Sequence, residues 1–499
     1  MVEIGKISVD VLRDRIAGGW AGKMIGVSYG APTEFRYRGV INEDPIRWEP
    51  KMVEQGLRDD DLYVQISFMM AMDEYGIDAP AAKFAESFAN AGFMLWHANR
   101  KARKNFWDGI MPPMSGHPDY NLHADDIDFQ IEADYIGFMC PGMPQTSNKI
   151  CDKIGHIMNY GDGVYGGMFI SSLHTAAYFE DDIQAVIKKA LRSIPARSQY
   201  ARCVQDVIGG HERDPDDWRK TWRELAEKWG EVDICGALEP FNIDAKINGA
   251  YVVMGLLYGE GDFEKTMEIS TRCGQDSDCN PSNAAGVWGV LNGYEKIPVK
   301  FRKHIPEITD SPFIYTNYTF NKAVDRTLDY ANDLIVENGG RIVGDTAYVR
   351  IQQPKEAEFE QSFPDMKARY RTTVEDEEHW EWKGEWRDES FSEFRLTETQ
   401  KVAEQKGSEM TFSFNGTGAL VMGRWDKDCG RADVYVDGRF VREIDCYYYV
   451  HGRGANDAHL FHVINLDLGD HTIRFVLNGK RNEKSEGTRI RISRAVVYT

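Results

Sequence analysis

The hydrophobic pattern of this chain changes once, near Asn338-Gly339-Gly340. Before this point, apolar residues recur at the helical spacing of three and four positions. Segments with this spacing lie at Val11–Ile25, Leu62–Tyr75, Ala79–Leu95, Ile183–Ile194, Trp218–Trp229, Ala245–Leu257, Phe263–Cys273 and Phe320–Val336. After it, apolar and polar residues alternate, which is typical of strands that bury one face. The pattern therefore predicts a helical part followed by an all-β part.

Turn signals separate the predicted strands of the second part. Asp437-Gly438 follows the alternating run Ala432–Val436, and Asn478-Gly479 ends the run Thr472–Leu477. Both dipeptides favour the two-residue turns of β-hairpins, and short strands at this spacing predict an antiparallel sandwich or jelly roll. We expect an all-α domain over residues 1–337, a connecting segment over 338–374 with a strand at Ala347–Ile351, and a β-sandwich over 375–499.

Two features of the helical part suggest close approach of a ligand or of another part of the chain. Long polar and aromatic loops are predicted near residues 105–130 and 139–166, and loops of this length often carry function. The first helix also contains several glycines, although glycine lowers helix stability; they are Gly18, Gly19, Gly22, Gly26 and Gly30. Tight packing against another helix explains these glycines as well as a ligand does.

Composition narrows the classes of partner. The 499 residues carry 59 basic and 79 acidic side chains, a formal charge of −20, which argues against nucleic acid and against an anionic membrane surface. No apolar run approaches the roughly 18 residues of a membrane span. The first residues lack the pattern of a signal peptide, so we expect a cytoplasmic protein, with the periplasm or secretion as alternatives if a signal peptide was removed. The eight cysteines show no metal-binding spacing, and a Cys429–Cys446 disulfide stays open.

Two short carboxylate clusters, Asp59-Asp60-Asp61 and Asp276-Ser277-Asp278, each precede a predicted helix. A helix start needs only one capping side chain, and two like charges about 4 Å apart cost roughly 4 kcal/mol at an effective dielectric constant near 20. Capping alone explains either cluster taken singly. If the clusters meet in space, however, a cation is the natural remedy, and oxygen ligands suit a hard ion such as Mg²⁺.

The combination of motifs resembles the ADP-ribosylglycohydrolase superfamily. The residues that carry the resemblance are the glycine-rich segment Gly18–Gly26, the run Asp59–Asp61, the segment Gly274–Cys279 and the small-residue stretch Ala284–Gly289. The resemblance implies an all-α domain that binds Mg²⁺, as one or two ions, with Mn²⁺ or Ca²⁺ as alternatives. It also implies cleavage of a glycosidic bond, with metal ligands at Asp59, Asp60, Asp61, Asp276 and Asp278.

Three residues depart from the family pattern. Asp59 stands where the first motif usually has a hydroxyl residue, and Cys279 stands where the second usually ends in Thr or Ser. A neutral thiol is a poor ligand for a hard cation. Lys23 replaces the acidic residue expected in the glycine-rich helix. These changes argue against ADP-ribose itself as the substrate more than against hydrolysis.

Other candidate residues follow from the same resemblance. We expect Glu34, in the loop after the glycine-rich helix, and Asp61 to be catalytic, with a surface glutamate as the alternative for Glu34. Asp162 and Gly163 lie in a glycine-rich segment that corresponds loosely to the family's substrate loop, and a plain tight turn explains them equally well. Asn248 is a candidate for hydrogen bonding to a sugar, although polar residues inside helices are more often structural.

The C-terminal part resembles galactose-binding jelly rolls, modules that often accompany enzymes acting on carbohydrate. The resemblance rests on Gly430–Gly438, Gly469–Phe475 and the tryptophans Trp380, Trp382 and Trp386. We therefore predict a metal-dependent glycoside hydrolase whose partner is a small-molecule or glycan substrate. ADP-ribosyl hydrolysis, and a non-catalytic sugar- or nucleotide-binding protein, remain as alternatives. A homo-oligomer is left open.

Overall fold

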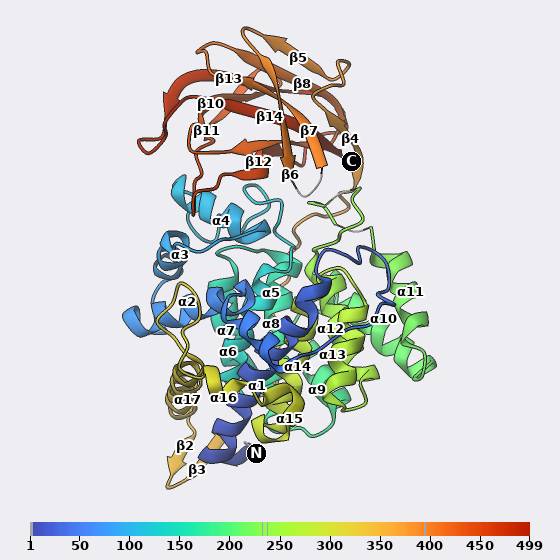
Figure 1. Ribbon diagram of the computed structural model, residues 1–499, viewed down its shortest axis with the longest axis vertical. Helices are drawn as coiled ribbons and strands as arrows, with labels where there is room; N and C mark the ends of the chain where they lie inside the picture. The colour runs from blue at the N-terminus through green and yellow to red at the C-terminus, as the bar shows by residue number, and fades with distance from the viewer. Residues whose placement is uncertain (1–2, 232, 237, 394–395) are drawn as a thin grey trace. The chain divides into compact units, whose positions relative to one another are not determined.

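A computed structural model of the chain describes residues 3–231, 233–236, 238–393 and 396–499. The chain divides into two compact units, a helical one and an all-β one (Figure 1). The helical unit comprises residues 1–91, 95–106 and 110–362, and the β unit comprises residues 92–94, 107–109 and 363–499. The predicted order, helical and then all-β with antiparallel sheets, is confirmed.

The helical unit contains a long first helix surrounded by shorter ones. Its helices are α1 (Val9–Gly30), α2 (Asp60–Tyr75), α3 (Ala81–Asn90), α4 (His97–Trp107), α5 (Asp128–Glu132), α6 (Asp134–Phe138), α7 (Pro144–Gly155), α8 (Gly161–Ala177), α9 (Ile183–Leu191), α10 (Gln199–Arg213), α11 (Trp218–Trp229), α12 (Ala245–Tyr258), α13 (Phe263–Arg272), α14 (Cys279–Asn292), α15 (Val299–Arg302), α16 (Ile305–Ile308) and α17 (Phe320–Glu337). The short 3₁₀ helices are η1 (Ala31–Thr33), η2 (Pro50–Leu57) and η3 (Tyr294–Lys296). Among the described residues, no helix is both long enough and apolar enough to span a bilayer.

One predicted loop is wrong. Residues 139–166 contain α7 and the start of α8, so Asp162 and Gly163 lie in the first turn of a helix and not in a loop. Helix α8 is buried on nearly every side. A helix without a solvent face has no alternation of polar and apolar residues to reveal it, and the glycines within α8 favour a loop assignment. A Cβ atom on Gly163 would lie 2.3 Å from the carbonyl oxygen of Ala124, so this glycine allows close packing.

The glycines of α1 allow the backbone of another segment to approach. Every fourth residue from Gly18 to Gly30 is glycine on the face that meets α14 and the residues just before it. At each of these four positions, a Cβ atom would lie 2.1–2.2 Å from a backbone carbonyl oxygen of that segment. Packing of α1 against α14 therefore explains these four glycines, which form a stripe on one face of α1. At Gly30 the oxygen belongs to Ser277, so the stripe also positions the second carboxylate cluster.

A three-stranded antiparallel sheet in the order β1-β3-β2 joins the two ends of the helical unit. It consists of β1 (Ile4–Ser8), β2 (Arg341–Val343) and β3 (Thr346–Arg350), and β3 corresponds to the strand predicted at Ala347–Ile351. No strand or helix occurs at residues 351–367, all of which are described.

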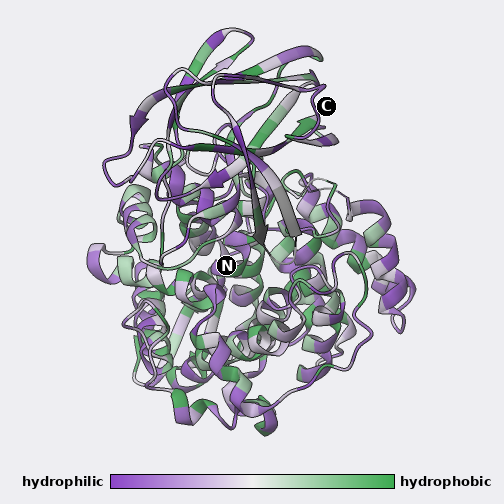
Figure 2. Cartoon of the chain, turned by 45° about the horizontal axis from the view of Figure 1, so that its top comes forward, coloured by the Kyte–Doolittle hydropathy of each residue, from purple (hydrophilic) through white to green (hydrophobic). Residues whose placement is uncertain are grey.

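The β unit is a sandwich of two antiparallel sheets around one apolar core. One sheet has the order β11-β10-β13-β8-β5; the other has the order β12-β9-β14-β7-β6, and β4 also pairs with β14. The strands are β4 (Ala368–Thr373), β5 (Trp380–Lys383), β6 (Arg387–Glu393), β7 (Leu396–Ala403), β8 (Glu409–Gly416), β9 (Gly418–Trp425), β10 (Gly430–Val436), β11 (Arg439–Asp445), β12 (Ala455–Val463), β13 (Gly469–Arg481) and β14 (Ile490–Tyr498). Every second residue of β10 is buried. Hydrophilic and hydrophobic residues both occur along the strands of the β unit (Figure 2).

One of the two predicted hairpin turns occurs. Asp437 and Gly438 have φ angles of 49° and 75° and connect β10 to β11, as expected of a two-residue turn. Asn478-Gly479 does not end a strand, because β13 continues through it to Arg481. Gly479 has a φ of 74°, and the pairing of β13 with β10 shifts register at this point, so the dipeptide forms a bulge.

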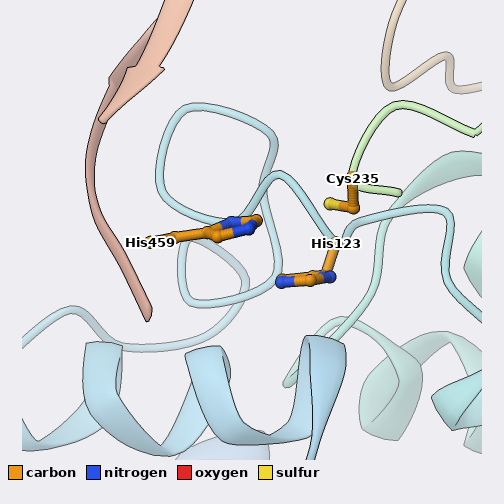
Figure 3. Close-up of side chains that lie close together, drawn as sticks. All are labelled: His123, Cys235 and His459. Carbon is orange, nitrogen blue, oxygen red and sulfur yellow. The ribbon is translucent and has the colours of Figure 1, made fainter. Parts of the chain in front are cut away.

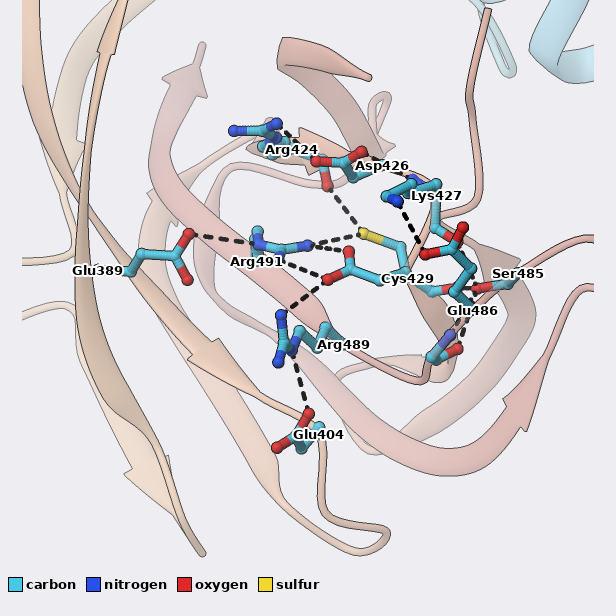
Figure 4. Close-up of polar contacts among 12 residues, drawn as sticks. Glu389, Glu404, Arg424, Asp426, Lys427, Cys429, Ser485, Glu486, Arg489 and Arg491 are labelled. Atoms are coloured by element: carbon cyan, nitrogen blue, oxygen red, sulfur yellow. Dashed lines mark hydrogen bonds and ion pairs between the residues drawn. The ribbon is translucent and has the colours of Figure 1, made fainter. Parts of the chain in front are cut away.

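Arg491 anchors a polar network inside the sandwich (Figure 4). Its guanidinium donates to both carboxylate oxygens of Asp428, at 2.6 and 3.0 Å, and to the sulfur of Cys429 at 3.4 Å. The side chain of Arg491 is only 5% exposed, so its charge is paired almost out of contact with water. Cys429 and Cys446 are free thiols, and the disulfide that the sequence left open is not formed.

Asp73 supports the contact between α2 and α17. It accepts hydrogen bonds from the hydroxyls of Tyr318 and Tyr330, at 2.6 and 2.7 Å, and from the guanidinium of Arg326 at 2.7 Å. Burial raises the pKa of Asp73, but these three donors outweigh it and hold the pKa below its ordinary value of 3.8.

Replacing Asp73 by asparagine is expected to lower the free energy of unfolding by about 1–2 kcal/mol near pH 7, because the donors lose a charged acceptor that is partly exposed to solvent. Since the folded-state pKa is lowered, the contribution is present above pH 4 and is lost as the pH falls through the folded pKa. Urea titrations of both proteins from pH 7 to pH 3 measure this. A difference that grows on acidification would contradict the assignment.

Candidate metal centre and active site

The first carboxylate cluster opens α2. Asp59 is the N-cap residue, and its Oδ1 accepts a hydrogen bond of 3.2 Å from the backbone N–H of Asp61. One aspartate is therefore sufficient to cap the helix, as the sequence suggested. Asp61 is completely buried, while Asp60 is half-buried in the same first turn. Two carboxylates of this cluster are thus left for another purpose.

The second cluster lies in the tight turn before α14. Gln275 has a left-handed φ of 56°, and this turn directs Asp276 and Asp278 into the protein. The backbone N–H of Asp276 donates to Oδ1 of Asn248 at 3.2 Å. Because the Asn248 amide also donates to two backbone carbonyls, of Asn242 and Asp244, its observed role is to hold this turn. A contact between Asn248 and a sugar stays a prediction.

The two clusters come together although 215 positions separate Asp61 from Asp276. Burial and the charge of Asp61 raise the pKa of Asp276 to about 6. Burial likewise raises the pKa of Asp60, and the charges of Asp59, Asp61, Glu34 and Asp276 add to the effect. Mutual repulsion of this kind between buried carboxylates is relieved by a cation.

Glu34 reaches the same place from a third segment. It follows η1, and its neighbour Thr33 shares a hydrogen bond of 2.8 Å with the hydroxyl of Ser277, which ties this loop to the second cluster. Burial, with smaller contributions from the charges of Asp276, Asp59 and Asp61, raises the pKa of Glu34 to about 8. The structure therefore brings Glu34 beside the five predicted ligands.

The donor set fits a hard divalent cation. Among the described residues, Oδ1 of Asp61 and Oδ1 of Asp278 are buried and accept no hydrogen bond. Leaving a buried acceptor unpaired costs about 1–3 kcal/mol, and coordination to a cation removes this cost. Within each cluster, the ligand atoms lie within 4.8 Å of one another. The neighbouring Cys279 contributes little, because burial raises the pKa of its thiol and keeps it neutral.

Lys23 lies against the first cluster. Its ammonium nitrogen is 3.2 Å from Oδ2 of Asp61 and 2.9 Å from Oδ2 of Asp134, and all three side chains are fully buried. Burial lowers the pKa of Lys23, but the two carboxylates outweigh it and raise the pKa. Lys23, which replaces the acidic residue of the family pattern, therefore introduces a positive charge beside Asp61, a predicted metal ligand.

Asp162 belongs to a separate polar cluster around Lys246. Burial raises the pKa of Asp162 to about 6, and the main charges acting on it are those of Lys246 and Asp244. Asp125 lies in the same cluster and accepts a hydrogen bond of 2.5 Å from Ser362. No described hydrogen bond or ion pair joins Asp162 to the five predicted ligands. A substrate contact for Asp162 and Gly163 stays a prediction.

Sequence reasoning missed Glu132, a buried acid facing the candidate centre. Its Oε1 accepts a hydrogen bond from Asn99, whereas its Oε2 has no partner among the described residues. Burial raises its pKa, with contributions from the charges of Asp60 and Asp61. The sequence feature that could have indicated Glu132 is the segment Asp125–Asp134, in which acids are interspersed with isoleucine and phenylalanine. Acids placed among apolar residues indicate buried carboxylates.

Two histidines lie close to one carboxylate, that of Asp126. His123 Nδ1 lies 2.6 Å from Oδ2 of Asp126, and His97 Nδ1 lies 3.8 Å from the same oxygen. His97 has a left-handed φ of 40°, an uncommon conformation for this residue type. Figure 3 shows His123 close to Cys235, whose thiol donates to the carbonyl of Leu122 at 2.7 Å.

An aromatic wall extends from Glu34 to these histidines. The ring of Phe35 lies edge-on to that of Phe241 at 5.2 Å, and the ring of His97 lies 6.4 Å from that of Phe241. The guanidinium of Arg38 lies within 6 Å of both phenylalanine rings. Phe241 packs against the apolar cluster that contains Cys279, which places the wall beside the second carboxylate cluster.

Comparison with curated proteins finds short similarities to two enzymes of Flavonifractor plautii. The chain is 33% identical over 93 residues to an A type blood alpha-D-galactosamine galactosaminidase, covering 19% of this chain and 8% of that protein. It is 34% identical over 93 residues to an A type blood N-acetyl-alpha-D-galactosamine deacetylase, covering 19% of this chain and 11% of that protein. The chain thus spans about a tenth of the length of these relatives.

Among solved structures, the chain is similar to an ADP-ribosylglycohydrolase-related protein complex, with a TM-score of 0.42 and 13% identity, over 64% of this chain and 98% of that one. A family model described as ADP-ribosylglycohydrolase matches residues 8–338, which is more than half of the chain and includes both carboxylate clusters. As the sequence resemblance predicted, this chain belongs to the ADP-ribosylglycohydrolase family.

Proposed function

We propose that this protein is a metal-dependent glycoside hydrolase that cleaves a glycosidic bond of a carbohydrate or furanoside. A hydrolase acting on sugars is what the family and the two short similarities support at a coarser level. The observation that carries the finer proposal is the convergence of two carboxylate clusters and Glu34 around buried oxygens that accept no hydrogen bond. Carboxylates beside an anomeric carbon suit an oxocarbenium-like transition state.

The five aspartates would hold the cation, with Mg²⁺ or Mn²⁺ as the hard ions that oxygen ligands favour. When bound, such an ion supplies Lewis acidity and orients sugar hydroxyls. Glu34 has a separate task, because it reaches the site from a different loop. Its carboxylate would take a proton from the attacking water or deliver one to the leaving oxygen.

The aromatic wall would form one side of the substrate site. Phe35 and Phe241 would contribute apolar ring surface that suits the apolar side of a sugar ring, and the Arg38 guanidinium over both rings would add a polar contact. Phe35 is 44% exposed, unlike most large apolar residues of the helical unit, so its ring is accessible to a ligand. The Asp126–His123 pair lies beyond His97 and would supply polar contacts to the aglycone or to a second sugar.

A hydrolysis panel tests this function. We expect release of the chromophore from an aryl glycoside, with N-acetyl-α-D-galactosaminide, α-D-galactosaminide and common furanosides included because of the two similarities. EDTA is expected to reduce the rate by at least about a hundredfold, and added Mg²⁺ or Mn²⁺ to restore it, because the carboxylates alone repel one another. Hydrolysis that proceeds unchanged in EDTA would contradict metal dependence.

Removal of ADP-ribose from protein or nucleotide is the second candidate, since the family model favours it. The same panel contains ADP-ribosyl-arginine and an ADP-ribosyl-serine peptide. Release from these substrates alone would replace the proposed function. A protein that hydrolyses none of them but binds a sugar or nucleotide in calorimetry would be the non-catalytic binding protein left open by the sequence.

A further inference from the structure

Lys23 is a fully buried lysine with every N–H of its ammonium group engaged. Its nitrogen lies 3.2 Å from Oδ2 of Asp61 and 2.9 Å from Oδ2 of Asp134, and it donates to the carbonyl of Ile131 at 2.7 Å. An ammonium group has three donors, so these three acceptors satisfy it completely. Lys23 therefore has a fixed position.

Asp134 holds the ammonium group of Lys23 beside the candidate centre. Its carboxylate also accepts hydrogen bonds from His174 at 2.9 Å and from the Asn283 amide at 3.0 and 3.1 Å. Asp134 is thus surrounded by donors, and it holds the ammonium in place. Asp61 differs, because Lys23 engages its Oδ2 while its Oδ1 has no partner among the described residues. Only one oxygen of Asp61 is left for a cation.

In two-metal sites the ions lie about 3.5–4 Å apart. Such a pair is held either by a carboxylate that uses both of its oxygens as a bridge or by several separate carboxylates. An ion on Oδ2 of Asp61, at a ligand distance of about 2.1 Å, would lie within roughly 5 Å of the Lys23 ammonium. The two cations would repel each other in a buried setting, where charges are poorly screened. The geometry therefore disfavours an ion on this side of Asp61.

We propose that the Lys23 ammonium takes the place of a second metal ion, so that the centre binds a single divalent cation. This inference rests on the proposed function to the extent that the five aspartates hold a metal. Oδ1 of Asp61 and Oδ1 of Asp278 are buried oxygens without partners in the described part of the chain, and they are the candidate ligand atoms for the single ion. Lys23 would balance the remaining negative charge of the first cluster.

Mn²⁺ binding tests the proposal without any substrate. The full chain is treated with EDTA and then titrated with Mn²⁺. Calorimetry and native mass spectrometry count the ions bound per chain. Electron paramagnetic resonance then examines the bound Mn²⁺. We expect one ion per chain and the six-line spectrum of an isolated Mn²⁺. Lys23→Met removes the ammonium and keeps an apolar side chain, and this variant is expected to bind two ions with an exchange-coupled spectrum.

Lys246→Met is the matched control, because Lys246 is another buried lysine that pairs with an aspartate, Asp244, outside the five ligands. It is expected to keep one ion per chain. Two ions in the unsubstituted protein would overturn the proposal, whether or not Lys23→Met folds. One ion in a folded Lys23→Met protein would overturn the role of Lys23, and no Mn²⁺ binding at all would overturn the inference together with metal dependence. One bound ion without any glycoside hydrolysis would contradict the proposed function and still support the ion count.

Discussion

Asp276→Asn is expected to lower kcat/KM for glycoside hydrolysis by at least about a thousandfold, or ~4 kcal/mol in transition-state stabilisation. Asp276 is buried in the turn before α14, where its charge acts on both Asp60 and Glu34. Asparagine has nearly the same shape, so the hydrogen bond from the Asp276 N–H to Asn248 is retained. Loss of activity then reports loss of the cation and not of the fold.

Glu34→Gln is the matched comparison for this experiment. Glu34 lies beside the ligands but comes from the loop after η1, so its replacement is expected to lower kcat while the bound Mn²⁺ remains. Mn²⁺ content, circular dichroism and steady-state kinetics are measured for both variants. An Asp276→Asn protein that keeps its metal and its turnover would refute the assignment of the ligands. Equal loss of metal in Glu34→Gln would make Glu34 a ligand instead of the acid or base.

Gly22→Ala is expected to lower the free energy of unfolding by about 3 kcal/mol. The added Cβ would lie 2.1 Å from the carbonyl oxygen of Ala285 and 2.6 Å from its carbon, and a helix backbone cannot move aside as a side chain can. Helices α1 and α14 would have to separate. Because α14 begins directly after Asp278, the separation is expected to weaken Mn²⁺ binding as well.

Gly209→Ala in α10 serves as the control for this substitution. A Cβ atom there would meet only the flexible end of Arg213, at 3.3 Å, so the change is expected to be neutral or to stabilise by up to about 1 kcal/mol through helix propensity. Urea denaturation and Mn²⁺ titration of both variants check the comparison. Equal stability of the two variants would show that the stripe of glycines on α1 is not required for packing.

Helices with a polar face were predictable, and fully buried ones were not. The helix at Trp218–Trp229 occurs with the predicted bounds, because its apolar residues recur on one side. Helix α8 was missed, because burial on nearly every side removes the periodicity on which such a prediction depends. The same reason hid α5, whose buried acids include Glu132. Asp437-Gly438 turned as predicted, whereas Asn478-Gly479 became a bulge because the pairing of β13 with β10 continues beyond it.

The sequence by itself determined which ligand types the candidate centre can offer. Three consecutive aspartates exceed the needs of one helix cap, and Asp276 and Asp278 add the same oxygen ligands, so residue type favours a hard cation if the two clusters meet. Only the tertiary structure decided which oxygens are open to that cation. Lys23 and Asp61 are 38 positions apart and meet because η2, which directly precedes α2, packs against α1. This contact occupies one oxygen of Asp61 and leaves the other without a partner among the described residues. Residue type sets what a side chain can bind, whereas packing decides which of its atoms already have a partner.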